Sequence, residues 1–238
     1  MKIALLGYGK MGKEIEQTAL ERNHEIGLII DISNTQDLNK KNLSAVDVAI
    51  DFSTPDSAYR NILTCFESDT PIVCGTTGWL DKFDEVNRLC KEKGSAFFYA
   101  PNFSLGVNIF FNLNKYLARI MNNFRDYDCS VEEIHHIHKL DAPSGTAITL
   151  SRDLIDLIDR KSRWELDQAS DMESIRITAI REAEVPGTHS IIYDSAVDSI
   201  EIRHRAKSRK GFALGAVMAA EFLCGRKGYF TMSDLLGF

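Results

Sequence analysis

The chain has 238 residues, of which 44% are hydrophobic and 26% charged, and its formal net charge is −6. This length allows one large or two small domains, and the negative charge argues against nucleic acid or an anionic membrane as a partner. The five cysteines are scattered and form no C-x-x-C pair, which argues against a disulfide framework or a structural zinc site. Without a signal-peptide pattern or an apolar stretch of spanning length, we expect a soluble cytoplasmic protein.

The first part of the chain alternates short apolar runs with helical patterns. The apolar runs, which predict buried strands, cover residues 2–6, 26–30, 46–50, 72–74 and 96–99. Helical periodicity covers 10–21, 55–66 and 80–93, whereas 35–44 is polar and too short to predict a helix. Strands that alternate with helices predict βαβ units, and therefore an α/β domain with a Rossmann-type, doubly wound parallel sheet over residues 1–105.

The pattern changes after residue 105. A long helix is predicted over 106–122, a strand over 127–136 and another helix over 144–160. Three strands then follow in succession, over 175–180, 190–196 and 199–206. Short connections between consecutive strands indicate a mixed or antiparallel sheet, so we expect a second, α+β domain over 106–210. The helix over 211–224 is rich in Ala and Gly, and we expect the segment 211–238 to pack back on the first domain.

A glycine pattern joins the first predicted strand to the first predicted helix. Gly7, Gly9 and Gly12 have the spacing G-x-G-x-x-G, and Asp31 ends the second apolar run about 20 residues later. The glycines permit a tight turn, a close approach of pyrophosphate and close helix packing, while the helix N-terminus attracts the phosphates. A glycine turn without a ligand is the alternative, but the strand, the helix and the acid favour a dinucleotide site.

Asp31 also bears on which dinucleotide binds. Its carboxylate should accept hydrogen bonds from the adenosine ribose and repel a 2′-phosphate, and no arginine directly follows it. This favours NADH, with NADPH as the alternative because Lys40 or Lys41 could reach the phosphate. The other cofactor-binding candidates lie at the first turn and at the ends of the later strands, where open α/β sheets bind ligands: Lys10, Met11, Phe52, Ser53, Gly75, Thr76, Thr77, Ala100, Asn102 and Phe103.

The stretch EIHHIHKLDAPSGTA, residues 133–147, concentrates titratable nitrogens before a predicted helix. If the strand continues, His136 and His138 share one face and His135 the other, so at most two imidazoles converge and no four-ligand zinc site forms; we expect no metal. A solvated strand end is the second alternative. The third is an anion-binding acid/base site, because the amides and hydroxyls of 143–146 open a helix, Lys139 adds positive charge and histidine transfers protons near neutral pH. We favour the third. The basic run 203–210 is in large part a solvated face.

Together these motifs resemble those of the dihydrodipicolinate reductase family of bacterial lysine biosynthesis. The resemblance extends over nearly the whole chain. The matching segments are the glycine fingerprint with Met11, the turn 75–78, the segment 100–104 with 106–108, and the histidine motif 133–147.

The resemblance implies a reductase that transfers a hydride from NADH or NADPH to a cyclic dicarboxylate imine, forming tetrahydrodipicolinate with loss of water. It implies that His135 is the general acid and that Lys139 assists it. The substrate carboxylates would be bound by His136, Ser144, Gly145 and Thr146. It also implies a homotetramer assembled through the sheet of the second domain.

The chain also departs from the family pattern. It is short, the segment 35–44 is thin, and Ala183 stands where a glycine is expected. Two other functions compete. An amino-acid dehydrogenase of the same broad fold would lack the His-His-x-His-Lys cluster joined to Pro-Ser-Gly-Thr. A nucleotide-sensing protein without catalysis would not need histidines and a lysine opposite the cofactor.

Overall fold

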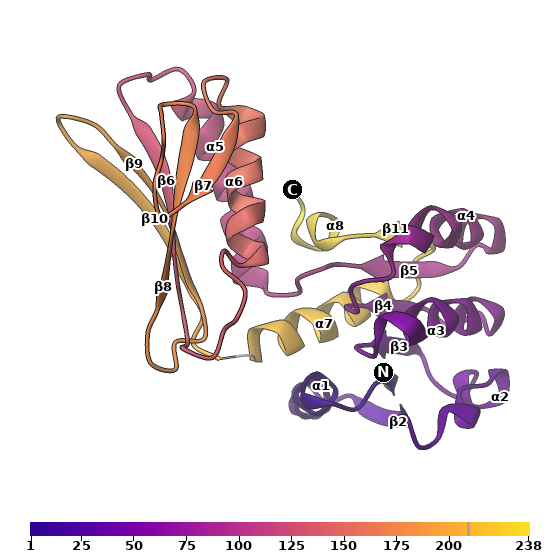
Figure 1. The fold of residues 1–238 in the computed structure, drawn as a ribbon. Coiled ribbons are helices and arrows are strands. Elements are labelled where there is room, and N and C mark those ends of the chain that lie inside the picture. The colour runs from indigo at the N-terminus through magenta and orange to yellow at the C-terminus, as the bar shows by residue number, and fades with distance from the viewer. Residues whose placement is uncertain (209) are drawn as a thin grey trace. The chain divides into compact units, whose positions relative to one another are not determined.

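The computed structural model describes residues 1–208 and 210–238, whose course is drawn in Figure 1. Within these residues, no helix combines the length and the apolar character needed to cross a membrane.

The first apolar runs form a six-stranded sheet in the order β11-β5-β4-β3-β1-β2, with every pair parallel. Its strands are β1 (Lys2–Leu6), β2 (Glu25–Ile30), β3 (Val48–Asp51), β4 (Ile72–Cys74), β5 (Ala96–Tyr99) and β11 (Gly228–Phe230). The predicted doubly wound parallel sheet is therefore confirmed. The sequence did not indicate β11, because Gly228–Phe230 contains no aliphatic residue and so does not form an apolar run like those of the other strands.

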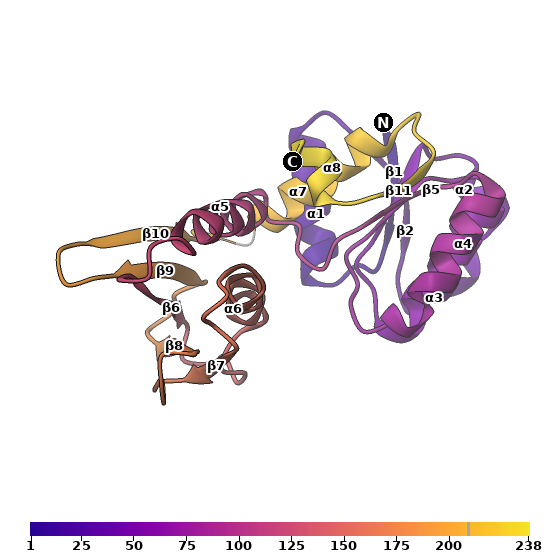
Figure 2. The same ribbon diagram turned by 90° about the horizontal axis from the view of Figure 1, so that it is seen from above.

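Helices cover both faces of this sheet, which explains why its strands are almost uniformly apolar. Helix α1 (Lys10–Glu21) and helix α7 (Lys210–Leu223) lie on one face, and α3 (Pro55–Glu67) and α4 (Phe83–Lys93) lie on the other (Figure 2). The short elements are η1 (Thr35–Asp37), α2 (Lys40–Leu43), η2 (Leu80–Lys82) and α8 (Met232–Leu236). The crossover from β2 to β3 contains only η1 and α2, as the polar segment 35–44 indicated.

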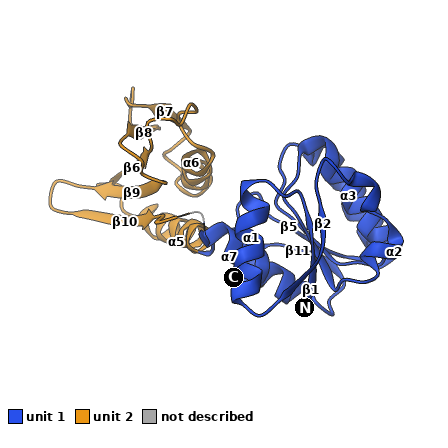
Figure 3. Cartoon of the chain, turned by 90° about the horizontal axis from the view of Figure 1, so that it is seen from below, with its two compact units in different colours: residues 1–105, 210–238 blue, residues 106–209 orange. Residues whose placement is uncertain are grey.

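The chain divides into two compact units, coloured separately in Figure 3. Unit 1 consists of residues 1–105 and 210–238, and unit 2 of residues 106–209. The tail belongs to unit 1 because α7 packs against α1 and against the strands of the parallel sheet. Its small residues permit this approach: a Cβ added at Gly215 would lie 1.8 Å from the carbonyl oxygen of Phe103.

Unit 2 contains a five-stranded mixed sheet in the order β10-β9-β6-β8-β7. Its strands are β6 (Asp128–His135), β7 (Arg163–Leu166), β8 (Ser174–Arg181), β9 (Thr188–Asp194) and β10 (Ser199–Arg205). Strand β6 pairs parallel with β8 and antiparallel with β9, which confirms the predicted mixed sheet. Helices α5 (Leu105–Met121) and α6 (Gly145–Leu157) lie along one face of it (Figure 1). The short strand β7 was not predicted.

Strand β6 places two polar residues on the buried face of unit 2. Its side chains alternate between half-buried and buried, and the buried set is Cys129, Val131, Glu133 and His135. A period of two is what a strand with one covered face requires. Glu133 and His135 therefore share the face that carries the apolar core, at the end of the strand.

Candidate active site

In the glycine turn of unit 1, packing excludes a side chain at two of the three glycine positions but not at the third. A Cβ added at Gly7, whose φ is +93°, would lie 2.3 Å from the Phe52 carbonyl oxygen, and one at Gly12 would lie 2.3 Å from the Gly7 carbonyl oxygen. At Gly9 no atom of the described residues lies within 4 Å of such a Cβ. Gly9 is the N-cap of α1 and provides no side chain to cap it. The surface over Gly9 and the first-turn amides is thus open to an anion.

A cavity of about 350 Å³ lies beside this turn. Of the predicted cofactor-binding residues, those that line it are Gly7, Gly9, Asp31, Phe52 and Ser53. The carboxylate of Asp31 is exposed, and its Oδ1 accepts the amide of Ile32 at 2.6 Å. Arg60 of α3 also lines this cavity. Arg60 was not predicted, because the candidate partners of a 2′-phosphate were sought only in the segment that follows Asp31, as far as Lys41.

Two of the predicted hydroxyls, those of Ser53 and Thr76, are bound to a buried carboxylate. Asp51 is fully buried at the end of β3, and it accepts hydrogen bonds from Thr76 Oγ1 at 2.5 Å, Asn61 Nδ2 at 2.6 Å and Ser53 Oγ at 2.9 Å. Burial raises the pKa of Asp51, and these hydrogen bonds act in the opposite direction. The hydroxyls of Ser53 and Thr76 therefore stabilise the edge of the sheet. Gly75 belongs to the same edge, where an added Cβ would lie 2.2 Å from the Phe52 ring.

The remaining cofactor candidates lie outside the lining of this cavity. They are Lys10, Met11, Gly12, Gly75, Thr76, Thr77, Ala100, Asn102 and Phe103. The segments 75–77 and 100–103 follow β4 and β5. Strand β4 pairs with β3 and β5 pairs with β4, so both segments extend the same sheet edge. Phe103 is buried, with its ring centroid 5.6 Å from that of Phe52. Its side chain supports this edge from the core.

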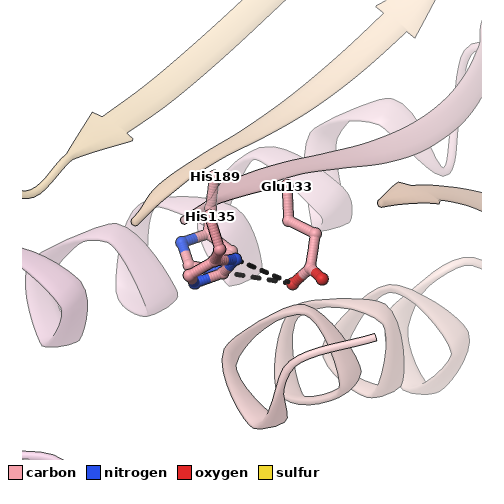
Figure 4. A group of neighbouring side chains, drawn as sticks. All are labelled: Glu133, His135 and His189. Atoms are coloured by element: carbon pink, nitrogen blue, oxygen red, sulfur yellow. Dashed lines mark ion pairs between the residues drawn. The ribbon is translucent and has the colours of Figure 1, made fainter. Parts of the chain in front are cut away.

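In unit 2, a buried cluster joins Glu133, His135 and His189 (Figure 4). Glu133 and His189 are direct partners across the antiparallel pair β6 and β9. Glu133 Oε2 lies 3.7 Å from His135 Nδ1 and 3.8 Å from His189 Nε2. The two imidazole centroids are 5.0 Å apart and the rings are nearly perpendicular. Glu133 Oε1 lies 3.3 Å from a terminal nitrogen of Arg181, which partly compensates the buried negative charge.

Burial controls the protonation of both histidines. It lowers the pKa of His135, an effect opposed by the negative charge of Glu133 and reinforced by the positive charges of Lys139 and Arg181. Burial, together with positive charge on His135, His204 and Lys139, lowers the pKa of His189 to about 3. His189 is therefore a neutral imidazole at physiological pH, whereas His135 responds to the charge placed beside it.

The other histidines of the motif lie in a loop. Strand β6 ends at His135, so the prediction that His136 and His138 share a strand face is wrong. His136 is half-buried, while His138 is exposed and lies 3.3 Å from Glu184. The imidazole that does approach His135 is that of His189, 54 positions later. The sequence contains a signal for it only through the register in which β9 pairs with β6.

Lys139 lies in the same loop and contacts a carboxylate of the chain itself. Its Nζ donates to both oxygens of Asp141 at 2.7 Å, and this pairing lowers the pKa of Asp141. Lys139 is close enough for its positive charge to lower the pKa of His135, although its Nζ is paired with Asp141.

Helix α6 begins with an open turn. Ser144 is its N-cap: the Oγ accepts the amide of Ala147 at 3.2 Å and lies 3.1 Å from His189 Nε2. Gly145 is exposed and Thr146 half-buried, and among the described residues their amides have no acceptor. These two amides are available to an anion, whereas the buried Ser144 hydroxyl is already used within the protein.

Glu133, His135 and His189 are close enough to share a cation, since their ligand atoms lie within 4.8 Å of one another. However, Arg181 already occupies one side of the Glu133 carboxylate, and its positive charge would repel a metal ion. We therefore assign no ion to this cluster.

Some residues of the basic run 203–210 form contacts within unit 2. Arg203 donates to Glu201 at 2.7 Å and to Ser190 at 2.9 Å, and the ring centroid of His204 lies 6.1 Å from that of Phe110. Arg209 lies outside the described residues.

Comparison with known proteins gives a consistent result over the whole chain. The family models described as dihydrodipicolinate reductase, N-terminus and C-terminus, match residues 1–103 and 106–236. A 4-hydroxy-tetrahydrodipicolinate reductase of Christiangramia forsetii is 52% identical over 99% of this chain and 98% of its own length. A reductase with the same description from Neisseria gonorrhoeae is 33% identical over 93% of this chain and 84% of its own length. The fold is similar to that of a dipicolinate-bound dihydrodipicolinate reductase from Paenisporosarcina sp. TG-14, with a TM-score of 0.80, 22% identity and 98% of each chain covered.

Proposed function

Because this chain belongs to the dihydrodipicolinate reductase family, we propose that residues 1–105 with 211–238 bind the dinucleotide and that 106–210 bind the substrate and supply the proton. The activity is that of an NAD(P)H-dependent 4-hydroxy-tetrahydrodipicolinate reductase in lysine and diaminopimelate biosynthesis. A hydride passes from the reduced nicotinamide to a cyclic dicarboxylate imine, and tetrahydrodipicolinate forms with loss of water.

The cavity beside the glycine turn is the proposed site of the cofactor's adenosine end. Support comes from the open surface over Gly9, where pyrophosphate can approach the first-turn amides of α1. Asp31 would accept the ribose hydroxyls, and its charge favours NADH. Arg60 lines the same cavity and could pair with a 2′-phosphate, so NADPH is the alternative cofactor. The segments 75–77 and 100–103 would contact the nicotinamide half.

The N-terminus of α6 is the proposed anchor for a substrate carboxylate, and this is the observation on which the site depends. The amides of Gly145 and Thr146 are open, and the buried His135 contacts the same Glu133 carboxylate that accepts the Ser144 amide. Two carboxylates require more than one anchor, and His136 and Lys139 in the adjoining loop would supply the rest.

His135 is the proposed general acid, with Lys139 assisting it. In the free protein, burial keeps the pKa of His135 low, so the imidazole is poorly protonated. A dicarboxylate bound beside it brings negative charge and raises that pKa. Substrate binding would thus charge the acid where hydride transfer needs a proton.

The test is a coupled assay in which aspartate semialdehyde and pyruvate form the cyclic imine with its synthase, while NADH and NADPH oxidation are followed separately. His135→Ala and Lys139→Ala should lower kcat strongly and leave NADH affinity unchanged, because both residues lie in unit 2. His138→Ala is the matched control, since this histidine of the same loop is exposed and pairs with Glu184, and its ring centroid lies 6.1 Å from that of His136. Failure of the wild type to oxidise either cofactor would contradict the activity. A parallel loss of NADH affinity in the first two variants would contradict the division of roles.

A homotetramer assembled through unit 2 is also proposed. One face of its sheet is packed by α5 and α6, while the outward side chains of β10 remain largely exposed. Large apolar side chains are exposed in this unit as well, among them Leu113, Tyr116 and Ile200, and contact with another chain would cover them. Light scattering after size exclusion should give the mass of four 26.8-kDa chains; a monomer mass would contradict the proposal.

We place the enzyme in the cytoplasm. All five cysteines are free, and four of them are buried. Unpaired thiols are usual in a reducing compartment. Fractionation of the producing cells would check this placement.

A further inference from the structure

The carboxylate of Glu133 has no part in the reaction proposed above, yet it contacts the proposed acid His135 and the N-cap residue Ser144. The residue is fully buried. Its Oε1 accepts from both terminal nitrogens of Arg181 at 3.3 Å, and its Oε2 accepts the Ser144 amide at 3.0 Å. The same Oε2 lies 3.7 Å from His135 Nδ1. One carboxylate oxygen thus contacts both the proposed acid and the N-cap of the anion-binding helix.

Arg181 links this carboxylate to the loop that carries Lys139. Its Nη2 donates to the carbonyl oxygen of Asp141 at 2.7 Å, and its Nε donates to that of Lys139 at 3.4 Å. Glu133 and Arg181 therefore attach the loop to β6 and β8 through backbone groups at positions 139, 141 and 144. Because this loop leads directly into α6, these contacts determine where the open amides of the helix lie.

The imidazole of His135 has one nitrogen toward Glu133 and one toward a glycine. Nδ1 is buried and has no hydrogen-bond partner within the described residues. A Cβ added at Gly187 would lie 3.1 Å from Nε2, so the glycine leaves that nitrogen uncovered. Because Nδ1 faces the Glu133 carboxylate at an ion-pair distance of 3.7 Å, Nε2 is the nitrogen left to exchange protons.

We propose that Glu133, held by Arg181, is a positioning residue that orients His135 through Nδ1 and the N-terminus of α6 through Ser144. The acid and the carboxylate anchor then keep a fixed separation. This inference rests on the proposed roles of His135 and of the Gly145 and Thr146 amides. A buried ion pair contributes little net stability, so its value here is the geometry it fixes.

The charges around His135 allow an experiment to distinguish a positioning role of Glu133 from a purely structural one. The groups that face its ring are Glu133 on β6, Arg181 on β8, His189 on β9, and Lys139 and Asp141 in the loop. The charge of Glu133 raises the pKa of His135, and that of Arg181 lowers it. Neutralising the carboxylate should therefore move the basic limb of the pH–rate profile to lower pH. Neutralising the guanidinium should move it to higher pH.

The experiment compares Glu133→Gln, Arg181→Gln and the control Glu132→Gln in the coupled assay. Glu132 is adjacent on β6 but on its opposite face, so the control makes the same charge change outside the cluster. We expect kcat/KM to fall roughly 10- to 100-fold in Glu133→Gln, the effect of a misplacement of about 1 Å. The basic limb of the pH–rate profile should shift in opposite directions in Glu133→Gln and Arg181→Gln, while their NADH affinity stays unchanged. Glu132→Gln should have the wild-type kcat/KM and pH profile.

The pKa of His135, measured by NMR of the labelled imidazole, gives a second readout that needs no turnover. If Glu133→Gln fails to fold, the double variant Glu133→Gln/Arg181→Gln removes both buried charges and should still lose turnover, with its basic limb near that of wild type. A Glu133→Gln enzyme with the wild-type kcat and pH profile would overturn the inference, as would an equal loss in Glu132→Gln or a fully active double variant. An unaffected His135→Ala enzyme would instead contradict the proposed function.

Discussion

Replacement of Gly9 by alanine should separate cofactor binding from folding. No described atom lies within 4 Å of the added Cβ, so the change in unfolding free energy should stay below about 1 kcal/mol. A methyl over the first turn of α1 would obstruct the pyrophosphate, and we expect NADH to bind at least about tenfold more weakly, or roughly 1.4 kcal/mol.

Gly7→Ala is the contrasting variant. Its φ of +93° and a Cβ only 2.3 Å from the Phe52 carbonyl oxygen oppose any side chain. The left-handed backbone costs about 1–2 kcal/mol and the crowding about 1–3 kcal/mol, so the protein should lose roughly 2–5 kcal/mol of stability. Urea unfolding and calorimetric NADH titration measure the two effects. Wild-type NADH affinity in Gly9→Ala would refute the assignment of this turn to the pyrophosphate.

Three further predictions concern selectivity, pH and packing. Asp31→Ala should weaken NADH more than NADPH, and Arg60→Ala should weaken NADPH more than NADH; titration of both cofactors checks the two signs, and equal losses would count against these roles. The pKa of His189 falls to about 3 on folding, so the unfolded chain binds more protons between pH 6.5 and 3, and this residue should lower stability by up to about 1.4 kcal/mol for each pH unit of acidification. Urea unfolding of His189→Asn should show a shallower decline over that window than wild type does. Leu154→Ala, at a fully buried position of α6, should cost roughly 2–5 kcal/mol, whereas Leu20→Ala, 54% exposed on α1, should change stability by about 0.5 kcal/mol or less.

Local patterns predicted much of the fold. The apolar runs that end in Gly7, Asp31 and Asp51 became parallel strands, because a strand covered on both faces must be apolar throughout. The mixed sheet of unit 2 followed from three consecutive alternating runs. Strands β7 and β11 were missed, since the four residues RWEL alternate too briefly to establish a period, and the three residues GYF include no aliphatic side chain, unlike the equally short β4.

The site was harder to predict than the fold, because its members come from distant parts of the chain. The motif 133–147 drew attention to His135 and Lys139, but the partners of His135 depend on strand register. Pairing of β6 with β8 and β9 brings Arg181 and His189 to it, and no local pattern encodes that register. Arg60 was missed for the same reason, since a helix rather than the adjoining loop carries it to the cavity.

A crystal structure with oxidised dinucleotide and dipicolinate, a planar dicarboxylate, would test the central claim most directly. We predict a carboxylate within hydrogen-bond distance of the Gly145 and Thr146 amides, beside His135 and Lys139, and pyrophosphate over Gly9. A dicarboxylate bound elsewhere, with the first turn of α6 empty, would contradict the account.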